Sequence, residues 1–342
     1  MNIAIVIFFL GILVALHEAG HFFMARVLGM KVLKYSIGFF KPLFMWTSQK
    51  TGIVYQIGSV PLGGFVQVKG MDPFEEGAFE DHDSYQMKSP WKRTLVIIAG
   101  PVANLIVAWV ILFAIVAFSG LPDTVNIAEI GQVVKDAPAY KAGLKKGDKV
   151  ISLNNKELKD WSTLADALHD NPAKPVILLI KRDGRLLSIS VTPKNVNGTG
   201  LIGIYPPTRN VSLSPVKAAL FATVKVKGVL RDTLNGLWGL ITGRSKDVQA
   251  VGPPGIVKMA KAQLETGMAS FMAFMSYISL MLFLFNLLPI PALDGGRGVF
   301  LMYEIITRKR VNKRVDATVN TVFFFIMMAF ILFISVKEIF AG

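Results

Sequence analysis

Three ionisable side chains on one helical turn, directly after an uncharged apolar run, constrain this chain more than any other feature. Residues 3–16 contain no charged or polar side chain, and the sequence His17-Glu18-Ala19-Gly20-His21 follows at once. A helix of this composition is long enough to span a bilayer, which needs about 20 apolar residues. Ionisable groups are expensive inside a membrane, so they indicate a functional site whose members have partners.

The spacing of the two histidines suggests a metal ion as that partner. His17 and His21 are four residues apart, so they share one helix face, where two imidazoles can bind one zinc ion. Glu18 lies beside them, and a carboxylate next to a metal can take a proton from the attacking water. The alternative is a chance spacing, which leaves the desolvation of three ionisable groups unexplained.

Composition agrees with a membrane protein. The mean hydropathy is +0.50 and 52% of the 342 residues are hydrophobic, which is too apolar for an ordinary soluble chain. The net charge of +14 raises the possibility of nucleic acid. The basic residues are scattered through loops, however, so we expect no nucleic-acid partner and a role at the membrane surface. The absence of cysteine excludes disulfides and thiolate metal sites.

Four apolar segments predict membrane spans, at about residues 2–28, 94–119, 269–288 and 318–336. Lysine and arginine accumulate after the first of these segments, and again at residues 308–314 between the last two. The positive-inside rule therefore places both of these loops in the cytoplasm. Both chain ends, and the long insert between the second and third spans, are then expected outside.

The remaining segments predict three further structures. Residues 36–70 are apolar, strand-like and punctuated by glycine and proline, which favours a β-hairpin dipping into the membrane boundary; a plain cytoplasmic loop is the alternative. The sequence of the insert predicts short strands with tight turns at 154–155 and 183–184. The predicted parts are an N-terminal membrane part at 1–120, a β-rich domain at 121–207, an amphipathic segment on the outer membrane face at 208–250 and a C-terminal membrane part at 251–342.

A catalytic zinc needs a third protein ligand, and Asp294 is the candidate. It follows Asn286-Leu-Leu-Pro289-Ile-Pro291-Ala-Leu at the end of the third span. The prolines break the helix, and the two glycines after Asp294 free the backbone to aim the carboxylate. The first and third spans run in the same direction, so Asp294 and the histidines fall towards the same, cytoplasmic ends. A helix-capping role for Asp294 is the alternative.

These motifs together resemble the site-2 protease family of intramembrane zinc metalloproteases. The resemblance rests on His17-Glu18-x-x-His21, on N-x-x-P-x-P-x-L-D-G-G at 286–296, and on an A-G-L-x-x-G-D sequence at 142–148 that is similar to a PDZ signature. The segments 61–66 and 91–104 support it. The bacterial branch with a single PDZ domain fits best, and the resemblance covers nearly the whole chain.

The resemblance implies a multi-pass α-helical membrane protein of about four spans, with a membrane-associated β-hairpin region and an inserted, mainly β PDZ domain. It implies a zinc metalloendopeptidase of the bacterial inner membrane, with one zinc per chain and the PDZ domain outside the cytoplasm. His17, His21 and Asp294 would hold the zinc, and Glu18 would activate water. The implied substrate-binding residues are Asn286, Pro289, Pro291, Gly63 and Gly64.

The implied substrates are membrane-spanning proteins in the lipid bilayer, of the anti-sigma-factor or signal-peptide-remnant type. A helical substrate hides its carbonyls in hydrogen bonds and must unwind before attack. The unwound substrate could pair with an edge of the hairpins, for which Tyr55 is the expected position. Two other classes compete: a non-catalytic PDZ membrane scaffold, expected to lose Glu18, and a metal transporter, expected to show internal repeats.

Overall fold

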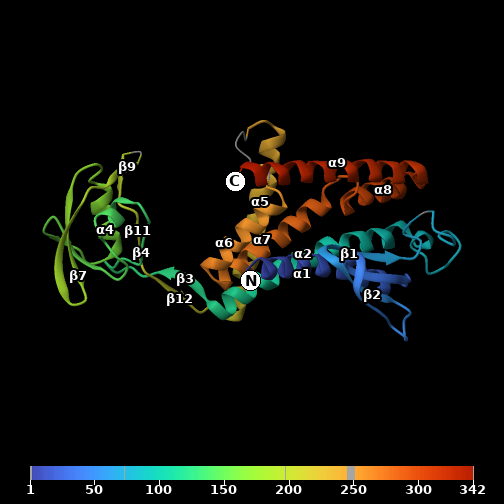
Figure 1. The fold of residues 1–342 in the computed structure, drawn as a ribbon, viewed down its shortest axis with the longest axis horizontal. Coiled ribbons are helices and arrows are strands. Elements are labelled where there is room, and N and C mark those ends of the chain that lie inside the picture. Colours follow the sequence, from blue (N-terminus) through green and yellow to red (C-terminus); the bar gives the residue numbers. More distant parts are fainter. Residues whose placement is uncertain (1, 73, 197, 245–250, 342) are drawn as a thin grey trace. The chain divides into compact units, whose positions relative to one another are not determined.

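The chain forms two compact units in a computed structural model that describes residues 2–72, 74–196, 198–244 and 251–341. Unit 1 comprises Met1–Val116 and Pro215–Gly342, and unit 2 comprises Ala117–Ser214. Unit 1 consists of helices and one long hairpin, whereas unit 2 is mostly short strands (Figure 1). Each unit buries a hydrophobic core of its own.

Unit 1 contains helices that are long and apolar enough to cross a bilayer. Within the described ranges there are four: α1 (Asn2–Val27), α2 (Pro90–Ser119), α7 (Met268–Leu287) and α9 (Lys313–Ala341). Each spans at least 20 residues, and about 20 suffice for the hydrocarbon core. The predicted multi-pass α-helical architecture is confirmed.

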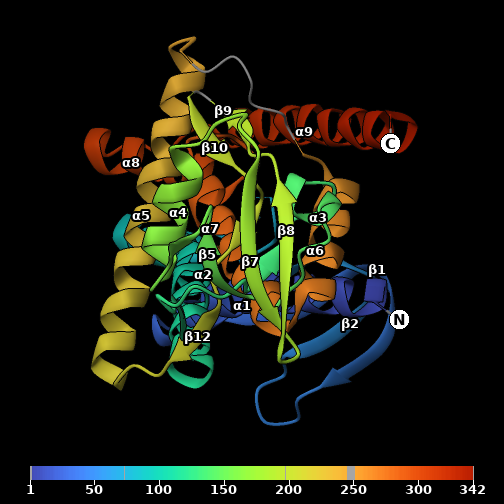
Figure 2. The ribbon, with the colours of Figure 1, turned by 90° about the vertical axis from the view of Figure 1, so that its left-hand side faces the viewer.

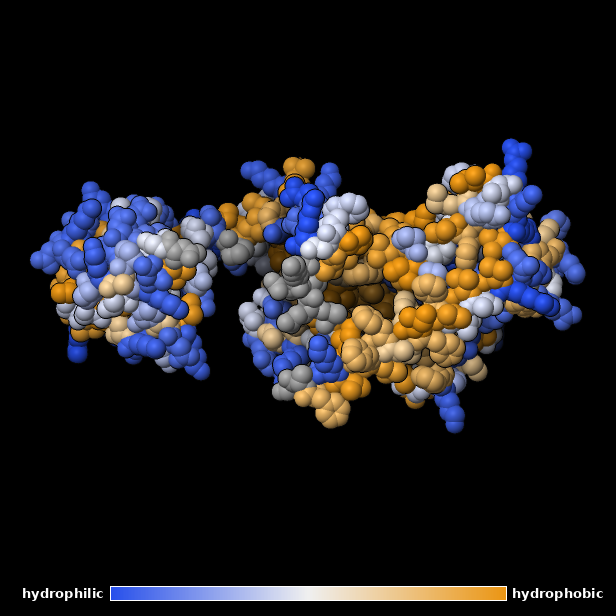
Figure 3. Space-filling model, turned by 90° about the horizontal axis from the view of Figure 1, so that it is seen from above, coloured by the Kyte–Doolittle hydropathy of each residue, from blue (hydrophilic) through white to orange (hydrophobic). Residues whose placement is uncertain are grey.

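The outer surface of unit 1 is suited to lipid. Figure 3 shows hydrophobic residues over most of its helical body, with hydrophilic residues gathered towards its margins. On α9 large side chains such as Phe323, Phe324 and Phe325 are exposed. A continuous apolar surface of this kind marks a membrane contact, because water would disfavour it.

Helix α7 is the centre of the helical packing. It contacts α1 and α6 (Pro253–Thr266) through buried Phe271 and Met275, and it contacts α2 and α5 (Pro215–Ile241) through Leu280. Two hydroxyls tie it to the α2 backbone: Ser276 Oγ donates to Ala108 O at 2.9 Å, and Ser279 Oγ donates to Asn104 O at 2.8 Å. Hydrogen bonds of this kind hold helices together where the solvent is as apolar as the side chains.

Helix α5 occupies most of the predicted amphipathic segment 208–250, whose last residues, 245–250, lie outside the described part of the chain. It runs steeply across α9 in both Figure 1 and Figure 2. Its Thr223 accepts a hydrogen bond from Trp109 Nε1 of α2 at 3.0 Å. Lys217, Lys225 and Lys227 remain exposed.

The hairpin consists of β1 (Val32–Thr47) and β2 (Val54–Val68), which pair antiparallel. The two strands bend so that they meet twice: Ile37 lies opposite both Gly64 and Ile57. The segments therefore lie side by side in the order 64–68, 32–37, 54–58 and 42–47. Tyr55 pairs with Tyr35 on one side and Trp46 on the other, so its expected edge position is wrong. Among the described residues no further strand pairs with 64–68 or 42–47, so these two segments are the free edges.

The hairpin is fixed against α1. Tyr35 Oη donates to the Ala15 carbonyl at 2.6 Å, and the ring of Phe22 packs edge-on against the Tyr35 ring. Phe22, Val68 and Val96 belong to one buried cluster that joins α1, β2 and α2. This packing lays the free edge 64–68 along the helix that carries the two histidines.

Unit 2 has the mainly β architecture predicted for the inserted domain. Its main sheet has the order β6-β5-β7-β8, and α4 (Trp161–His169) packs on it (Figure 2). The other elements are three strand pairs and a short helix. The bounds are β3 (Leu121–Thr124), β4 (Gln132–Val133), α3 (Pro138–Lys141), β5 (Lys149–Leu153), β6 (Lys156–Glu157), β7 (Val176–Arg182), β8 (Arg185–Val191), β9 (Lys194–Val196), β10 (Thr199–Leu201), β11 (Ile204–Tyr205) and β12 (Thr208–Val211).

Two local features of unit 2 follow from its sequence. The predicted turns Asn154-Asn155 and Asp183-Gly184 have φ of 49°, 65°, 50° and 82°, the positive values that two-residue hairpin loops require. Asp148, which ends the PDZ-like motif, is buried and pairs with Arg182 through two contacts of 2.7 Å. A paired, bidentate carboxylate of this kind is tolerated in a core and fixes the turn that carries it.

Candidate active site

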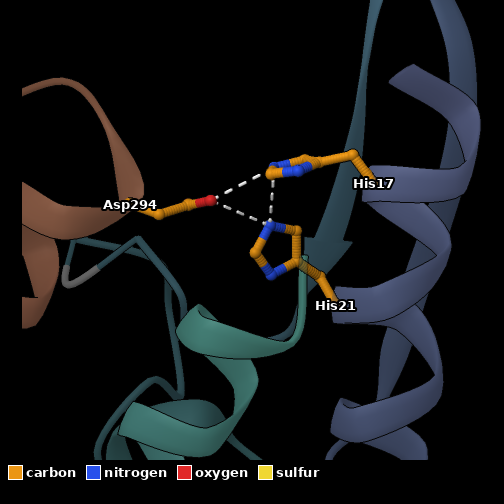
Figure 4. A group of neighbouring side chains, drawn as sticks. All are labelled: His17, His21 and Asp294. Carbon is orange, nitrogen blue, oxygen red and sulfur yellow. Dashed lines mark hydrogen bonds and ion pairs between the residues drawn. The ribbon is translucent and has the colours of Figure 1, made fainter. Parts of the chain in front are cut away.

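Three side chains from two helices converge in unit 1 (Figure 4). His17 and His21 come from α1, and Asp294 is the first residue of α8 (Asp294–Thr307). Asp294 Oδ2 lies 3.1 Å from His17 Nε2 and 3.3 Å from His21 Nε2, and the two Nε2 atoms are 3.3 Å apart. Both histidines are buried.

This triangle of donor atoms has the size of one face of a zinc tetrahedron. Zinc takes nitrogen and oxygen ligands at about 2.0–2.2 Å, which places tetrahedral ligands roughly 3.3–3.6 Å from one another. Two of the three observed separations are 3.3 Å, at the short end of this range, and the third, 3.1 Å, is slightly shorter. Asp294 Oδ2 is buried and accepts no hydrogen bond from the described residues. The donor set therefore fits a zinc ion.

The other ring nitrogens of the histidines face α2. His21 Nδ1 lies 2.8 Å from the carbonyl oxygen of Val96, which can only accept, so the proton is on Nδ1 and the lone pair is on Nε2. His17 Nδ1 lies 3.1 Å from the side-chain amide of Asn104. Gly100, between these two contacts along α2, lies directly against the His21 ring.

The break after α7 places Asp294. Helix α7 ends at Leu287, and Ala292 takes a left-handed conformation with φ of 71° while its N–H donates to Asn320 Oδ1 of α9 at 2.8 Å. Leu293, and not Asp294, occupies the N-cap position of α8. The geometry therefore does not support the helix-capping alternative. The first turn of a helix also favours an anionic side chain through the helix dipole.

Glu18 and the hairpin border one cavity. This cavity, of about 340 Å³, is lined by His17, Glu18, His21 and Asp294 together with the hairpin segment 64–68 and Asn286. A Cβ added to Gly64 would lie 3.2 Å from Glu18 Cγ, so the free edge of the sheet directly contacts this carboxylate side chain. The backbone of the sheet edge thus lies beside Glu18 and the three convergent side chains.

The predicted substrate-binding residues divide into two groups. Asn286 and Gly64 line the cavity, whereas Gly63, Pro289 and Pro291 are not among its lining residues. Gly63 has φ of 119° and packs on the Phe39 ring, so it shapes the hairpin. The prolines shape the loop that delivers Asp294.

Sequence reasoning missed two contributors to this region. Arg297 lies three residues after Asp294, on the same helix face, and lines the cavity. It also lines a second cavity of about 950 Å³, whose wall shares Phe65, Val66, Val68 and Met71 with the first. The contribution of α2, through Val96, Gly100 and Asn104, was not predicted, because residues 91–104 only supported the family resemblance; the signal for it is a spacing of four residues. That spacing acquires a meaning once the partner helix is known.

Comparison with known proteins identifies the family. Residues 5–330 match the sequence model of peptidase family M50. The chain is 30% identical to the regulator of sigma-W protease RasP of Bacillus subtilis over an alignment of 419 positions, gaps included. The alignment covers 98% of this chain and 97% of that protein. The chain is 28% identical over 408 residues to the zinc metalloprotease RasP of Geobacillus kaustophilus, covering 96% and 95%.

Similarity to solved structures covers a smaller share of the chain. The PDZ domain of the SdrC-like protein Lmo2051 from Listeria monocytogenes aligns with 25% of this chain and 93% of its own, at 20% identity and a TM-score of 0.22. The family match extends over both units and includes the segments that carry the three convergent side chains. The chain therefore belongs to peptidase family M50, the site-2 protease family, and is a multi-pass zinc metalloendopeptidase of the membrane.

Proposed function

We propose that this chain hydrolyses peptide bonds within or near the spans of membrane proteins, at one zinc ion held by His17, His21 and Asp294. The observation that carries the proposal is the triangle of three donor atoms, 3.1–3.3 Å apart, two of which come from a helix that can span a membrane. Glu18 lines the same cavity. A site with two imidazoles, one carboxylate and a neighbouring glutamate has the composition of a hydrolytic zinc centre.

The residues of the site then have distinct tasks. When bound, zinc supplies Lewis-acid chemistry towards water and the scissile carbonyl. The Glu18 carboxylate accepts a proton from the attacking water and returns it to the leaving nitrogen. Asp294 completes the ligand set, which leaves one coordination position open to reactants.

The substrate is held as an extended strand. A transmembrane helix hides its carbonyls in internal hydrogen bonds, so it must unwind before hydrolysis. The free edge 64–68 borders the cavity and offers unpaired backbone groups to an unwound peptide. Asn286, which also lines the cavity, can hydrogen-bond the peptide backbone with its amide. Gly64 has no side chain, and this leaves room for the substrate next to Glu18.

Water reaches the site from the cytoplasmic side. The 950 Å³ cavity shares a wall with the catalytic cavity and carries charged residues on its lining, among them Arg93, Glu304 and Arg310. Arg93 and Arg310 both pair with Glu304, which joins α2, α8 and the connection to α9. A cavity with these charged side chains on its wall can hold the water that the reaction consumes.

In this proposal residues 30–93 and 308–314 lie on the cytoplasmic side, and unit 2 lies outside the cytoplasm. The Bacillus subtilis relative is named as a regulator of sigma-W. We accordingly place anti-sigma-factor-like membrane proteins, together with signal-peptide remnants, among the substrates. Unit 2 excludes substrates with bulky outer domains by its size.

The test is cleavage of a membrane-spanning reporter by the purified, zinc-loaded chain. Wild type should cut within or near the span, and Glu18→Gln should bind zinc equally but leave the reporter intact, because Glu18 is a base and not a ligand. An intact reporter with zinc-loaded wild type, or equal cleavage by both proteins, would contradict the proposal. The first result would favour a non-catalytic scaffold or a metal transporter.

A further inference from the structure

One face of α2 serves both histidines. Val96, Gly100 and Asn104 are spaced by four residues, so they lie in one row along the helix. All three residues are buried, and each contacts a histidine ring: Val96 and Gly100 contact His21, and Asn104 contacts His17. The row is therefore the support on which the two imidazoles rest.

The contact to His21 shows what such support achieves. Val96 O accepts a hydrogen bond from Nδ1–H of His21 at 2.8 Å. Because a carbonyl cannot donate, this bond fixes the proton on Nδ1 and turns the Nε2 lone pair towards Asp294 and His17. Histidine ligands in metalloproteins commonly have such an acceptor behind them.

Asn104 faces His17 as Val96 faces His21, except that an amide nitrogen, and not a carbonyl oxygen, lies against the ring Nδ1. As placed, the Asn104 amide nitrogen lies 3.1 Å from His17 Nδ1, while Asn104 Oδ1 is buried and has no partner among the described residues. The amide nitrogen and oxygen are nearly equivalent in shape, so their assignment follows from the hydrogen bonds they can make. An amide N–H facing Nδ1 would leave the His17 proton on Nε2, where a ligand needs its lone pair.

We infer that Asn104 is a positioning residue whose Oδ1 accepts the Nδ1–H of His17 when zinc is bound, so that Nε2 of His17 is free to hold the metal. The inference rests on the proposed zinc site. Asn104 then does with a side chain for His17 what Val96 does with its backbone for His21. The unpaired Oδ1 acquires a donor in this arrangement.

The position of Asn104 is itself held. Its side chain and backbone are fully buried, and its carbonyl accepts the Ser279 Oγ hydrogen bond at 2.8 Å. Ser276, one turn away on α7, binds the Ala108 carbonyl at 2.9 Å. Helix α7 contains Asn286 in its last turn and is followed by the loop before Asp294. Helix α2, which supports both histidines, is therefore bound to the helix that precedes the third ligand. A support held in this way preorganises the metal site.

The first test compares zinc affinity, measured by competition with a chelator, in the full-length protein. Asn104→Leu should weaken zinc binding about 10- to 100-fold, the usual effect of losing a partner behind a ligand. Asn104→Asp should stay within a few-fold of wild type, because a carboxylate oxygen also accepts Nδ1–H. Asn235→Leu is the matched control: it makes the same exchange on α5, at an exposed position outside the cavity lining, and should retain zinc affinity.

The second test reads the tautomer in the zinc-loaded wild type by ¹⁵N NMR of the imidazoles. The chain has four histidines, and the other two, His82 and His169, are exposed. His17 and His21 should both carry a proton on Nδ1 and bind metal through Nε2. This measurement needs no variant, so it stands even where a substitution prevents folding.

Three results would overturn the inference: unchanged zinc affinity in Asn104→Leu, equal losses in Asn104→Leu and Asn104→Asp, or metal bound to Nδ1 of His17. Failure of the proposed function looks different. In that case the wild type itself would bind no stoichiometric zinc, whatever residue occupies position 104.

Discussion

Gly100 offers a strict test of the site geometry, because the change to alanine adds one methyl group at a known place. A Cβ at position 100 would overlap His21 Nε2, and it would lie 2.5 Å from Cε1 and 2.8 Å from Cδ2 of the same ring. Ordinary contact begins near 3.4 Å. The imidazole must therefore retreat by about 1 Å, since the α2 backbone is tied to α7 and cannot move freely.

A shift of this size is large on the scale of metal binding. Ligand distances are held to within about 0.2 Å in a working site, and a misplacement of about 1 Å can cost roughly 100-fold in rate. We expect Gly100→Ala to lose at least about 10-fold in zinc affinity and about 100-fold in proteolysis. The helix itself gains about 1 kcal/mol from the exchange of glycine for alanine, so the fold should survive.

Gly298→Ala is the matched control. Gly298 lies in α8, four residues after Asp294, and a Cβ there would meet nothing within 4 Å. It should bind zinc and cut a membrane-spanning reporter like the wild type. Wild-type zinc affinity in Gly100→Ala would show that the His21 ring does not lie where Figure 4 places it, and would refute the reasoning.

Four further outcomes are expected. Asn286→Ala should slow cleavage, mainly through a higher KM, with zinc content unchanged; normal kinetics would place the substrate elsewhere. Hydrogen bonds from the Thr163 N–H and from Ser162 lower the pKa of Asp160, so the stability that this carboxylate gives α4 is present above the unfolded pKa and is lost as pH falls through the folded pKa. In wild type this loss lowers the Tm of unit 2 below about pH 4, and Asp160→Asn should remove this part of the decrease. An unchanged dependence of Tm on pH in Asp160→Asn would contradict the cap. A single cysteine at position 155 should be labelled from outside the cell and one at position 309 from inside; cytoplasmic labelling at 155 would overturn the topology. Joining Thr124 to Thr208, which pair across β3 and β12, by a two-residue turn deletes most of unit 2 and should permit cleavage of reporters with a folded outer domain; loss of cleavage of a short-tailed reporter, with zinc retained, would instead show that unit 2 recruits substrates.

Features set by local chemistry could be predicted from the sequence. Two histidines four residues apart share a helix face whatever surrounds them, and ionisable groups in an apolar helix require partners. Asp294 could be found because the direction of the spans placed it at the same depth as the histidines. The turns at 154–155 and 183–184 followed from asparagine, aspartate and glycine tolerating positive φ.

Features set by distant partners could not be predicted. The interior position of Tyr55 depends on a long hairpin pairing with itself twice, and register shifts along β1 decide that pairing. Helix α8 begins three residues after Pro291 and contains Gly295 and Gly296 in its first turn, a composition that by itself favours a loop. Asn104 is one polar residue in an apolar helix, and only the approach of α1 shows what its amide contacts.

X-ray absorption at the zinc edge of the purified chain and of Asp294→Ala tests the central claim most directly. The wild type should contain one zinc per chain with two imidazole nitrogens and oxygen ligands at about 2.0–2.2 Å. The Asp294→Ala variant should either lose the metal or have another ligand in place of the carboxylate oxygen in the zinc coordination shell. A wild-type zinc bound by fewer than two imidazoles, or a coordination shell unchanged by the loss of Asp294, would contradict the account.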